Sequence, residues 1–153
     1  MQTPKPVLGN FGENLVCATC RCPRCKRSKT LKRLPPGFKC ADLICDFCGF
    51  LGQVKTCTIQ GLDPLPGVLP SKLLGAAWGP QKERMESAIY FPLFLVAATP
   101  NLKVSAIYYL SADLQPPDLF LPRKPLSASA KRAGWCGFLY DLDAVRDRLV
   151  RLA

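Results

Sequence analysis

Two Cys-x-x-Cys pairs constrain the fold of this chain more than any other feature of its sequence. Cys22 and Cys25 form the first pair, and Cys45 and Cys48 form the second, about twenty residues later. A two-residue spacer lets both sulfur atoms of a pair face the same metal ion, so the two pairs together predict a four-thiolate site for one zinc ion. Because protein ligands take all four positions of such a site, we expect the zinc to be structural.

The remaining cysteines indicate the redox environment of the protein. The chain has nine cysteines and no histidine. An odd number of cysteines with two metal-type pairs fits metal binding in a reducing compartment better than a disulfide framework, so we expect a cytoplasmic protein. Cys17 and Cys20 form a third pair that could compete for the zinc, whereas Cys40, Cys57 and Cys136 are expected to be small buried side chains.

Neither a membrane span nor an export signal is predicted. The longest apolar run covers residues 89–98, which is too short to cross a bilayer and contains Pro92. The first residues of the sequence lack the apolar segment of a signal peptide. With 153 residues, of which 48% are hydrophobic, the chain can build the core of one domain.

Positive side chains gather in two clusters and produce a formal net charge of +10. The first cluster consists of Arg21, Arg24, Lys26, Arg27, Lys29, Lys32 and Arg33. The second cluster consists of Arg123, Lys124, Lys131 and Arg132. Such clusters attract a polyanion by releasing its counterions, so nucleic acid is the predicted partner, although either cluster alone is equally well explained as a solvated basic face. Trp135, beside the second cluster, is expected either to stack on DNA or to pack in the core.

Local composition predicts an irregular start followed by a β-rich region. Residues 1–16 contain two prolines and two glycines, so we expect an irregular lead-in with at most a short helical turn over residues 13–16. Residues 38–44 and 50–59 are rich in apolar and β-branched side chains and are predicted to be strands. A turn at residues 45–49 should join them.

The second half of the chain predicts further elements. Residues 61–70 are expected to be a loop because of their proline and glycine content, and residues 81–87 a short helix. Residues 89–99 and 102–110 are apolar and predict an antiparallel strand pair in the core. In residues 141–152 apolar side chains recur at helical spacing behind an aspartate, which predicts an amphipathic helix.

Three polar residues near the second cysteine pair are the candidates for chemistry. If residues 38–59 fold into a hairpin symmetric about its turn, Asp42 lies opposite Gln53, and Lys55 shares the face of Gln53 because strand side chains alternate. Asp42 and Gln53 would then offer oxygen ligands to Mg²⁺, which binds phosphate oxygens alongside its protein ligands. Lys55 could hold the attacking water and offset charge on the phosphate. Such a set would hydrolyse a phosphodiester without histidine.

The order of these motifs resembles the PD-(D/E)xK nucleases, and more narrowly the DpnI-type restriction endonucleases, also called Dam-replacing proteins. The matching segments are Cys22 to Cys25, Ala41-Asp42 with Cys45 to Cys48, Gln53 to Lys55, and Arg123 to Leu126 with Ala130 to Gly137. The similarity covers most of residues 20–145. It implies an α/β fold, namely a restriction-endonuclease-like mixed β-sheet core with flanking helices and an embedded four-cysteine zinc site.

The resemblance also implies a function. DpnI-type enzymes are Mg²⁺-dependent endonucleases that cleave double-stranded DNA at adenine-methylated GATC sites. On this basis Asp42 and Gln53 would bind the magnesium, Gln53 standing where these enzymes usually have glutamate, and Lys55 would be the catalytic lysine. The residues expected to contact DNA are Arg123, Lys124, Lys131, Arg132 and Trp135.

The expected domain organisation follows from the same resemblance. Residues 17–153 would form a single catalytic domain with its zinc region at residues 20–50, and the chain ends at Ala153 without room for the C-terminal winged-helix domain of the family. Glu13 could assist the metal, but a charge at the start of a helix is the favoured interpretation.

Two alternatives to an active nuclease remain open at this point. Because glutamine is neutral, the chain could be a catalytically weakened or inactive zinc-ribbon module that only binds DNA. A zinc-stapled interaction protein with no nucleic-acid role is the third and weaker interpretation.

Overall fold

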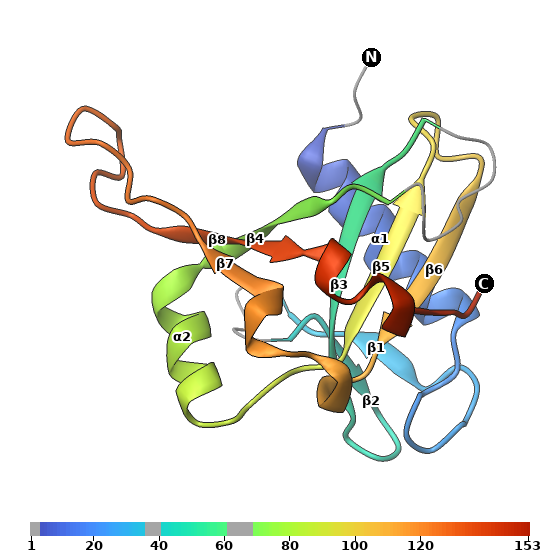
Figure 1. Ribbon diagram of the computed structural model, residues 1–153. Helices are drawn as coiled ribbons and strands as arrows, with labels where there is room; N and C mark the ends of the chain where they lie inside the picture. The colour runs from blue at the N-terminus through green and yellow to red at the C-terminus, as the bar shows by residue number, and fades with distance from the viewer. Residues whose placement is uncertain (1–3, 36–40, 61–68) are drawn as a thin grey trace.

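The computed structural model describes residues 4–35, 41–60 and 69–153 and shows a mixed α/β fold (Figure 1). A six-stranded sheet has the order β1 (Leu31–Arg33), β2 (Leu43–Cys45), β3 (Leu51–Thr58), β5 (Leu93–Ala98), β6 (Ser105–Leu110), β9 (Val150–Arg151). A second sheet has the order β4 (Lys72–Ala77), β8 (Gly137–Asp141), β7 (Phe120–Pro122). The helices are α1 (Lys5–Thr19) and α2 (Trp78–Glu86). The predicted fold class, with its embedded cluster of four cysteines, is confirmed.

The centre of the large sheet is the parallel pair β3 and β5. Gln53 pairs with Leu93 at one end of this ladder and Thr58 with Ala98 at the other. All six residues of β5 are buried, as expected for a strand covered on both faces. The predicted antiparallel pair is confirmed as β5 and β6, which are joined in register from Leu93 and Leu110 onward.

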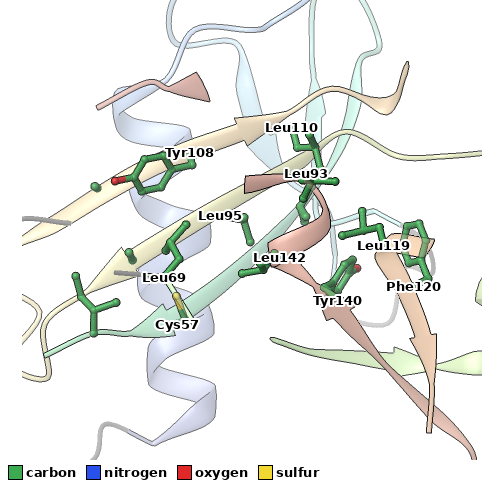
Figure 2. Packing of buried hydrophobic residues seen from close by; sticks show 14 of the residues in the cluster. Cys57, Leu69, Leu93, Leu95, Tyr108, Leu110, Leu119, Phe120, Tyr140 and Leu142 are labelled. Atoms are coloured by element: carbon green, nitrogen blue, oxygen red, sulfur yellow. The ribbon is translucent and has the colours of Figure 1, made fainter. Parts of the chain in front are cut away.

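Two hydrophobic clusters lie on opposite faces of the large sheet. On one face α1 packs through Val16 against side chains such as Val54 and Phe94. On the other face the small sheet and the turns after it contribute Tyr140 and Leu142, which pack with Leu95 of β5 (Figure 2). The sheet is therefore the middle layer of the molecule.

The irregular lead-in predicted for residues 1–16 is wrong, because the chain from Lys5 to Thr19 is helical. Pro4 is the N-cap of α1 and Pro6 lies in its first turn, where the backbone has no intrahelical acceptor for an N–H group and proline is tolerated. Gly12 has a packing role within the helix. A Cβ atom at Gly12 would collide with the hydroxyl of Thr56 on β3, so glycine permits the close approach of helix and sheet.

The amphipathic helix predicted for residues 141–152 is also wrong. β8 continues to Asp141 and is followed by 3₁₀ turns at Leu142–Ala144 and Arg146–Arg148, and then by β9. Leu142 and Val145 are both fully buried. Their spacing of three residues suits one face of a 3₁₀ turn as well as one face of an α-helix, which explains the error.

The other predicted elements agree with the structure where the described residues include them. The short helix is present as α2, and the turn at residues 45–49 joins β2 to β3. β2 begins only at Leu43, and residues 36–40 of the predicted first strand lie outside the described residues. Most of the predicted loop at residues 61–70 also lies outside them.

Replacing Gly12 with alanine should destabilise the protein. The change gains up to about 1 kcal/mol of helix propensity, but the collision with Thr56 should outweigh it and give a net loss of about 1–2 kcal/mol. At Gly9 in the same helix, an added methyl group would have no atom within 4 Å, so Gly9→Ala should instead stabilise the protein. Urea unfolding of the two variants measures the difference.

A second substitution separates this collision from other effects of Gly12→Ala. The hydroxyl of Thr56 is buried without a hydrogen-bond partner among the described residues, so removing it should cost little. Thr56→Ala should therefore restore stability when combined with Gly12→Ala. Equal stability of the Gly12→Ala and Gly9→Ala proteins would contradict this account of the helix–sheet contact.

Candidate metal centre and candidate active site

The four cysteines of the two pairs form one compact cluster. Their Sγ atoms all lie within 4.8 Å of one another. Across the pairs, Cys22 Sγ is 3.6 Å from Cys48 Sγ and Cys25 Sγ is 3.8 Å from Cys45 Sγ. A zinc ion with four Zn–S bonds of about 2.3 Å requires sulfur atoms about 3.8 Å apart, so the cluster could bind zinc with little rearrangement.

The two pairs are built as near copies of one backbone turn. In the first, the N–H of Lys26 donates to the carbonyl of Cys22 at 2.9 Å; in the second, the N–H of Gly49 donates to the carbonyl of Cys45 at 2.9 Å. Lys26 and Gly49 both have positive φ angles, of 66° and 80°. Each turn thus aims its two sulfur atoms at the same point before any metal is considered.

The other cysteines lie outside this cluster. Cys20 is buried at the C-terminal end of α1. Neither Cys20 nor Cys17 belongs to the group of four, which is the one such group of histidine, cysteine and acidic residues within the described ranges. Cys57 is buried as predicted, and burial raises the pKa of its thiol to about 11. Cys136 is only half-buried, and Cys40 lies outside the described residues.

The hairpin between β2 and β3 has the predicted register. Leu43 pairs with Gly52 and Ile44 with Leu51, which aligns Asp42 with Gln53. The ladder of β2 stops at Leu43. Beyond it the N–H of Asp42 still donates to the carbonyl of Gly52 at 2.9 Å, and the side chain of Asp42 makes the next contact with β3. Its Oδ2 accepts a hydrogen bond of 2.8 Å from the N–H of Val54, so the carboxylate is held at the edge of β3.

Gln53 faces the small sheet, where Tyr140 reaches it. The hydroxyl of Tyr140 donates to Oε1 of Gln53 at 3.3 Å. Burial, and to a lesser extent the negative charge of Asp42, raises the pKa of Tyr140 well above its usual range, so the phenol stays protonated and remains a donor. Sequence reasoning missed Tyr140 because its apolar neighbours mark it only as a core residue.

Glu13 also belongs to this region, although it lies on α1. Burial and the negative charge of Asp42 raise the pKa of Glu13, whereas Arg33 and Lys55 lower it, so its carboxylate lies within electrostatic range of both Asp42 and Lys55. Arg33 forms a salt bridge of 3.3 Å with Glu13. The interpretation of Glu13 as a charge at the helix start is wrong, because the helix begins at Lys5.

Lys55 completes the group. It lies two residues after Gln53 on β3, in register with Leu95 of β5, and its side chain is partly exposed. Asp42 and Gln53 are thus aligned where the β2–β3 ladder ends, Lys55 follows on β3, and Glu13 lies within electrostatic range of Asp42 and Lys55. Carboxylate and amide oxygen atoms are the ligands that hard divalent cations prefer.

The first basic cluster is partly engaged in internal contacts. Arg33 binds Glu13 and donates to the side chains of Asn10 and Asn14. The guanidinium of Arg27 lies 3.8 Å from the ring centre of Phe47, which is 60% exposed at the tip of the second cysteine turn. Arg33 thus contacts the candidate active site through Glu13, and Arg27 contacts the second cysteine turn through Phe47.

The second basic cluster lies on an arm between β7 and β8, residues 123–136, which extends away from both sheets (Figure 1). Its four basic residues are exposed and form no salt bridge within the described part of the chain. Trp135 is half-buried: the guanidinium of Arg132 lies 4.4 Å from its ring centre, and its ring lies close to the backbone of Gly137. Trp135 therefore packs within the arm and belongs to neither hydrophobic cluster.

No helix in the described ranges is both long enough and apolar enough to cross a membrane.

Comparison with known protein families agrees with the motif order of the sequence. The model of the DpnI, Dam-replacing family matches residues 8–149. This range contains most of α1 with Glu13, both cysteine pairs, the β2–β3 hairpin and the basic arm, and it covers most of the chain. The protein therefore belongs to the DpnI, Dam-replacing family.

Proposed function

We propose that this protein is a Mg²⁺-dependent DNA endonuclease that cleaves phosphodiester bonds in double-stranded DNA, with adenine-methylated GATC sites as its targets. Membership of the DpnI family points to a nuclease. The observation that carries the proposal is the grouping of Asp42, Gln53 and Lys55 on one hairpin, with Glu13 brought to them by α1.

Asp42, Gln53 and Glu13 would hold the magnesium. Within the described residues, Oδ2 of Asp42 is engaged with the backbone of Val54, whereas its second oxygen has no such contact. Oε1 of Gln53, which accepts from Tyr140, would be the amide oxygen among the ligands. When bound, the magnesium would polarise the phosphate and make a coordinated water more acidic.

The neutral Gln53 is compatible with this role because the site has a second source of charge. In place of the usual glutamate, the amide contributes an oxygen without a negative charge. The carboxylate of Glu13 lies within electrostatic range of Asp42 and supplies a charge that the sequence motif alone does not reveal. Two carboxylates and one amide oxygen are a donor set that suits Mg²⁺.

Lys55 would act on the water and the phosphate. Its ammonium group carries three donors and can orient a water molecule for attack while offsetting charge that builds on the phosphate. DNA itself would be held by the basic arm. Its candidate contacts are Arg123, Lys124, Lys131, Arg132 and Trp135.

The metal bound by the four cysteines is proposed to be zinc in a purely structural role. All four ligands are thiolates, so no position is left for substrate. The cluster joins the segment after α1 to the turn between β2 and β3. Zinc would thus support the hairpin that carries Asp42, Gln53 and Lys55 without touching the DNA.

The alternative is a DNA-binding module without catalysis. Its support is the hydrogen bond from Val54 to Asp42, which gives the carboxylate a structural role that would persist without a metal. In that case DNA binding would weaken with salt but would be independent of Mg²⁺ and of Asp42.

Lys55→Ala should abolish most of the cleavage. Losing a charged group that acts in the transition state should lower the rate by about 100-fold or more. The measurement is nicking of methylated and unmethylated plasmid in Mg²⁺. Lys103→Ala, which removes the same charge from an exposed turn, is the matched control and should cut like the wild type. Equal rates for the two variants, or no cleavage by the wild type on either plasmid, would favour the binding module.

Gln53→Glu should lower the Mg²⁺ concentration needed for half-maximal cleavage several-fold, because it adds a negative charge at the proposed metal site. Gln60→Glu adds the same charge at an exposed position just after β3 and should leave the Mg²⁺ dependence unchanged. Titrations of the cleavage rate with Mg²⁺ compare the variants. If Gln53→Glu left the Mg²⁺ requirement unchanged, residue 53 would not be a metal ligand.

Loss of one cysteine ligand should release the zinc and destabilise the protein. The wild type should contain about one zinc per chain, measured by elemental analysis. Cys48→Ser should lose the zinc and melt at a clearly lower temperature, whereas Cys136→Ser, which changes a half-buried cysteine outside the cluster, should keep it. A Cys48→Ser protein with full zinc content and an unchanged melting temperature would contradict the assignment.

A further inference from the structure

A cleft of about 920 Å³ lies beside the cysteine turns, separate from the polar side chains of the hairpin. The first cysteine turn, the end of α1, the start of β3 and the chain after β6 surround it. Its volume is within the range of small-molecule sites. None of Glu13, Asp42 or Lys55 lines it, so the proposed nuclease chemistry leaves it unexplained.

One wall of the cleft is strongly basic. Arg21, Arg24 and Lys26 line it. Arg24 is fixed, because it donates to the carbonyl of Cys48 at 3.3 Å and its guanidinium lies 5.9 Å from the ring centre of Phe50. Arg21 and Lys26 are exposed and have no acidic partner in the described part of the chain. Asp113 is the one acidic residue in the cleft lining, and no salt bridge joins it to these cations within the described residues, so the wall offers positive charge to a ligand.

An aromatic surface accompanies the basic wall. Tyr109 lines the cleft and is half-buried, and its ring is held against Phe94 with centroids 5.1 Å apart. It also lies within electrostatic range of both Arg24 and Asp113. A tyrosine held rigidly by a buried ring is a suitable platform for a planar ligand, since little side-chain freedom is lost on binding.

We propose that this cleft binds a nucleotide, with its base on Tyr109 and its phosphate at Arg21, Arg24 and Lys26. Arginine matches the geometry of phosphate oxygens, and aromatic side chains stack on any base. The ligand is either a free nucleoside monophosphate or an unpaired nucleotide of a DNA strand. A DNA strand bound at the candidate active site would pass close to the cleft. Pro92 lines the cleft, and its carbonyl accepts from the N–H of Gln53 at 2.8 Å.

Calorimetric titration with deoxyadenosine monophosphate, deoxyadenosine and inorganic phosphate tests the proposal. The monophosphate should bind more tightly than either part alone. Tyr109→Leu and Arg21→Ala should each weaken it about tenfold. Lys103→Ala, which removes a basic residue from an exposed turn outside the cleft, should have no effect. Equal binding of deoxyadenosine and its monophosphate, no binding at all, or equal affinity of Arg21→Ala and Lys103→Ala would overturn the proposal.

A second titration distinguishes the two sources of the nucleotide. A short single-stranded oligonucleotide that binds at least tenfold more tightly than the monophosphate and competes with it identifies a DNA strand as the ligand, whereas equal or weaker binding identifies the free nucleotide. Both titrations are repeated with Lys55→Ala, where binding should persist. Cleavage and nucleotide binding are thereby measured separately. A protein that does not cleave DNA could still bind the nucleotide, so failure of the nuclease proposal does not overturn the nucleotide proposal.

Folding controls keep the test decisive. Tyr109 contacts Phe94 in the core, so Tyr109→Leu is checked by thermal melting before its affinity is interpreted. Arg21 is exposed and its replacement should leave the melting temperature unchanged. If Tyr109→Leu does not fold, two other results test the proposal. These are the affinity of Arg21→Ala and the protection of residues 19–26 and 109–113 from hydrogen exchange by the monophosphate. Absence of that protection would count against the cleft.

Discussion

The cluster of four cysteines is the constraint on which the rest of the candidate site depends. β1 and β2 have three residues each, and strands this short gain little from their own ladder. The cysteine turns join the segment after α1 to the β2–β3 turn, and so hold β1 against β2 and β2 against β3. A metal in the cluster would convert this arrangement into a single cross-linked unit.

This arrangement also explains why the polar site forms where it does. β2 stops pairing with β3 at Gly52, and no strand of the described residues pairs with this edge of β3 from Val54 onward. The carboxylate of Asp42 takes the free N–H of Val54, and α1 approaches the same strand closely at Gly12. The next residue of the helix, Glu13, is thereby brought into electrostatic range of Asp42 and Lys55. A strand end, a carboxylate and a helix therefore meet at one point.

The sequence predicted the parts of this site that depend on local spacing. The symmetric hairpin aligns Asp42 with Gln53, and the two cysteine pairs form one cluster, as the motif spacing indicates. It did not predict the parts that depend on tertiary contacts. Glycine in residues 1–16 suggested irregular backbone, whereas Gly12 serves a close helix–sheet contact. Tyr140 approaches Gln53 from a strand far along the chain, and no local pattern could place it there.

Tyr140 and Glu13 together give a physical reason for an amide at position 53. A glutamate there would add a third carboxylate to a region that already holds Asp42 and Glu13, and it would face the buried hydroxyl of Tyr140. Without a bound cation, three negative charges in a half-buried site repel one another and raise the cost of folding. Gln53 avoids this repulsion and still accepts the hydrogen bond of Tyr140. In the proposed enzyme, the amide therefore lowers the affinity of the site for magnesium, but it makes the metal-free protein more stable.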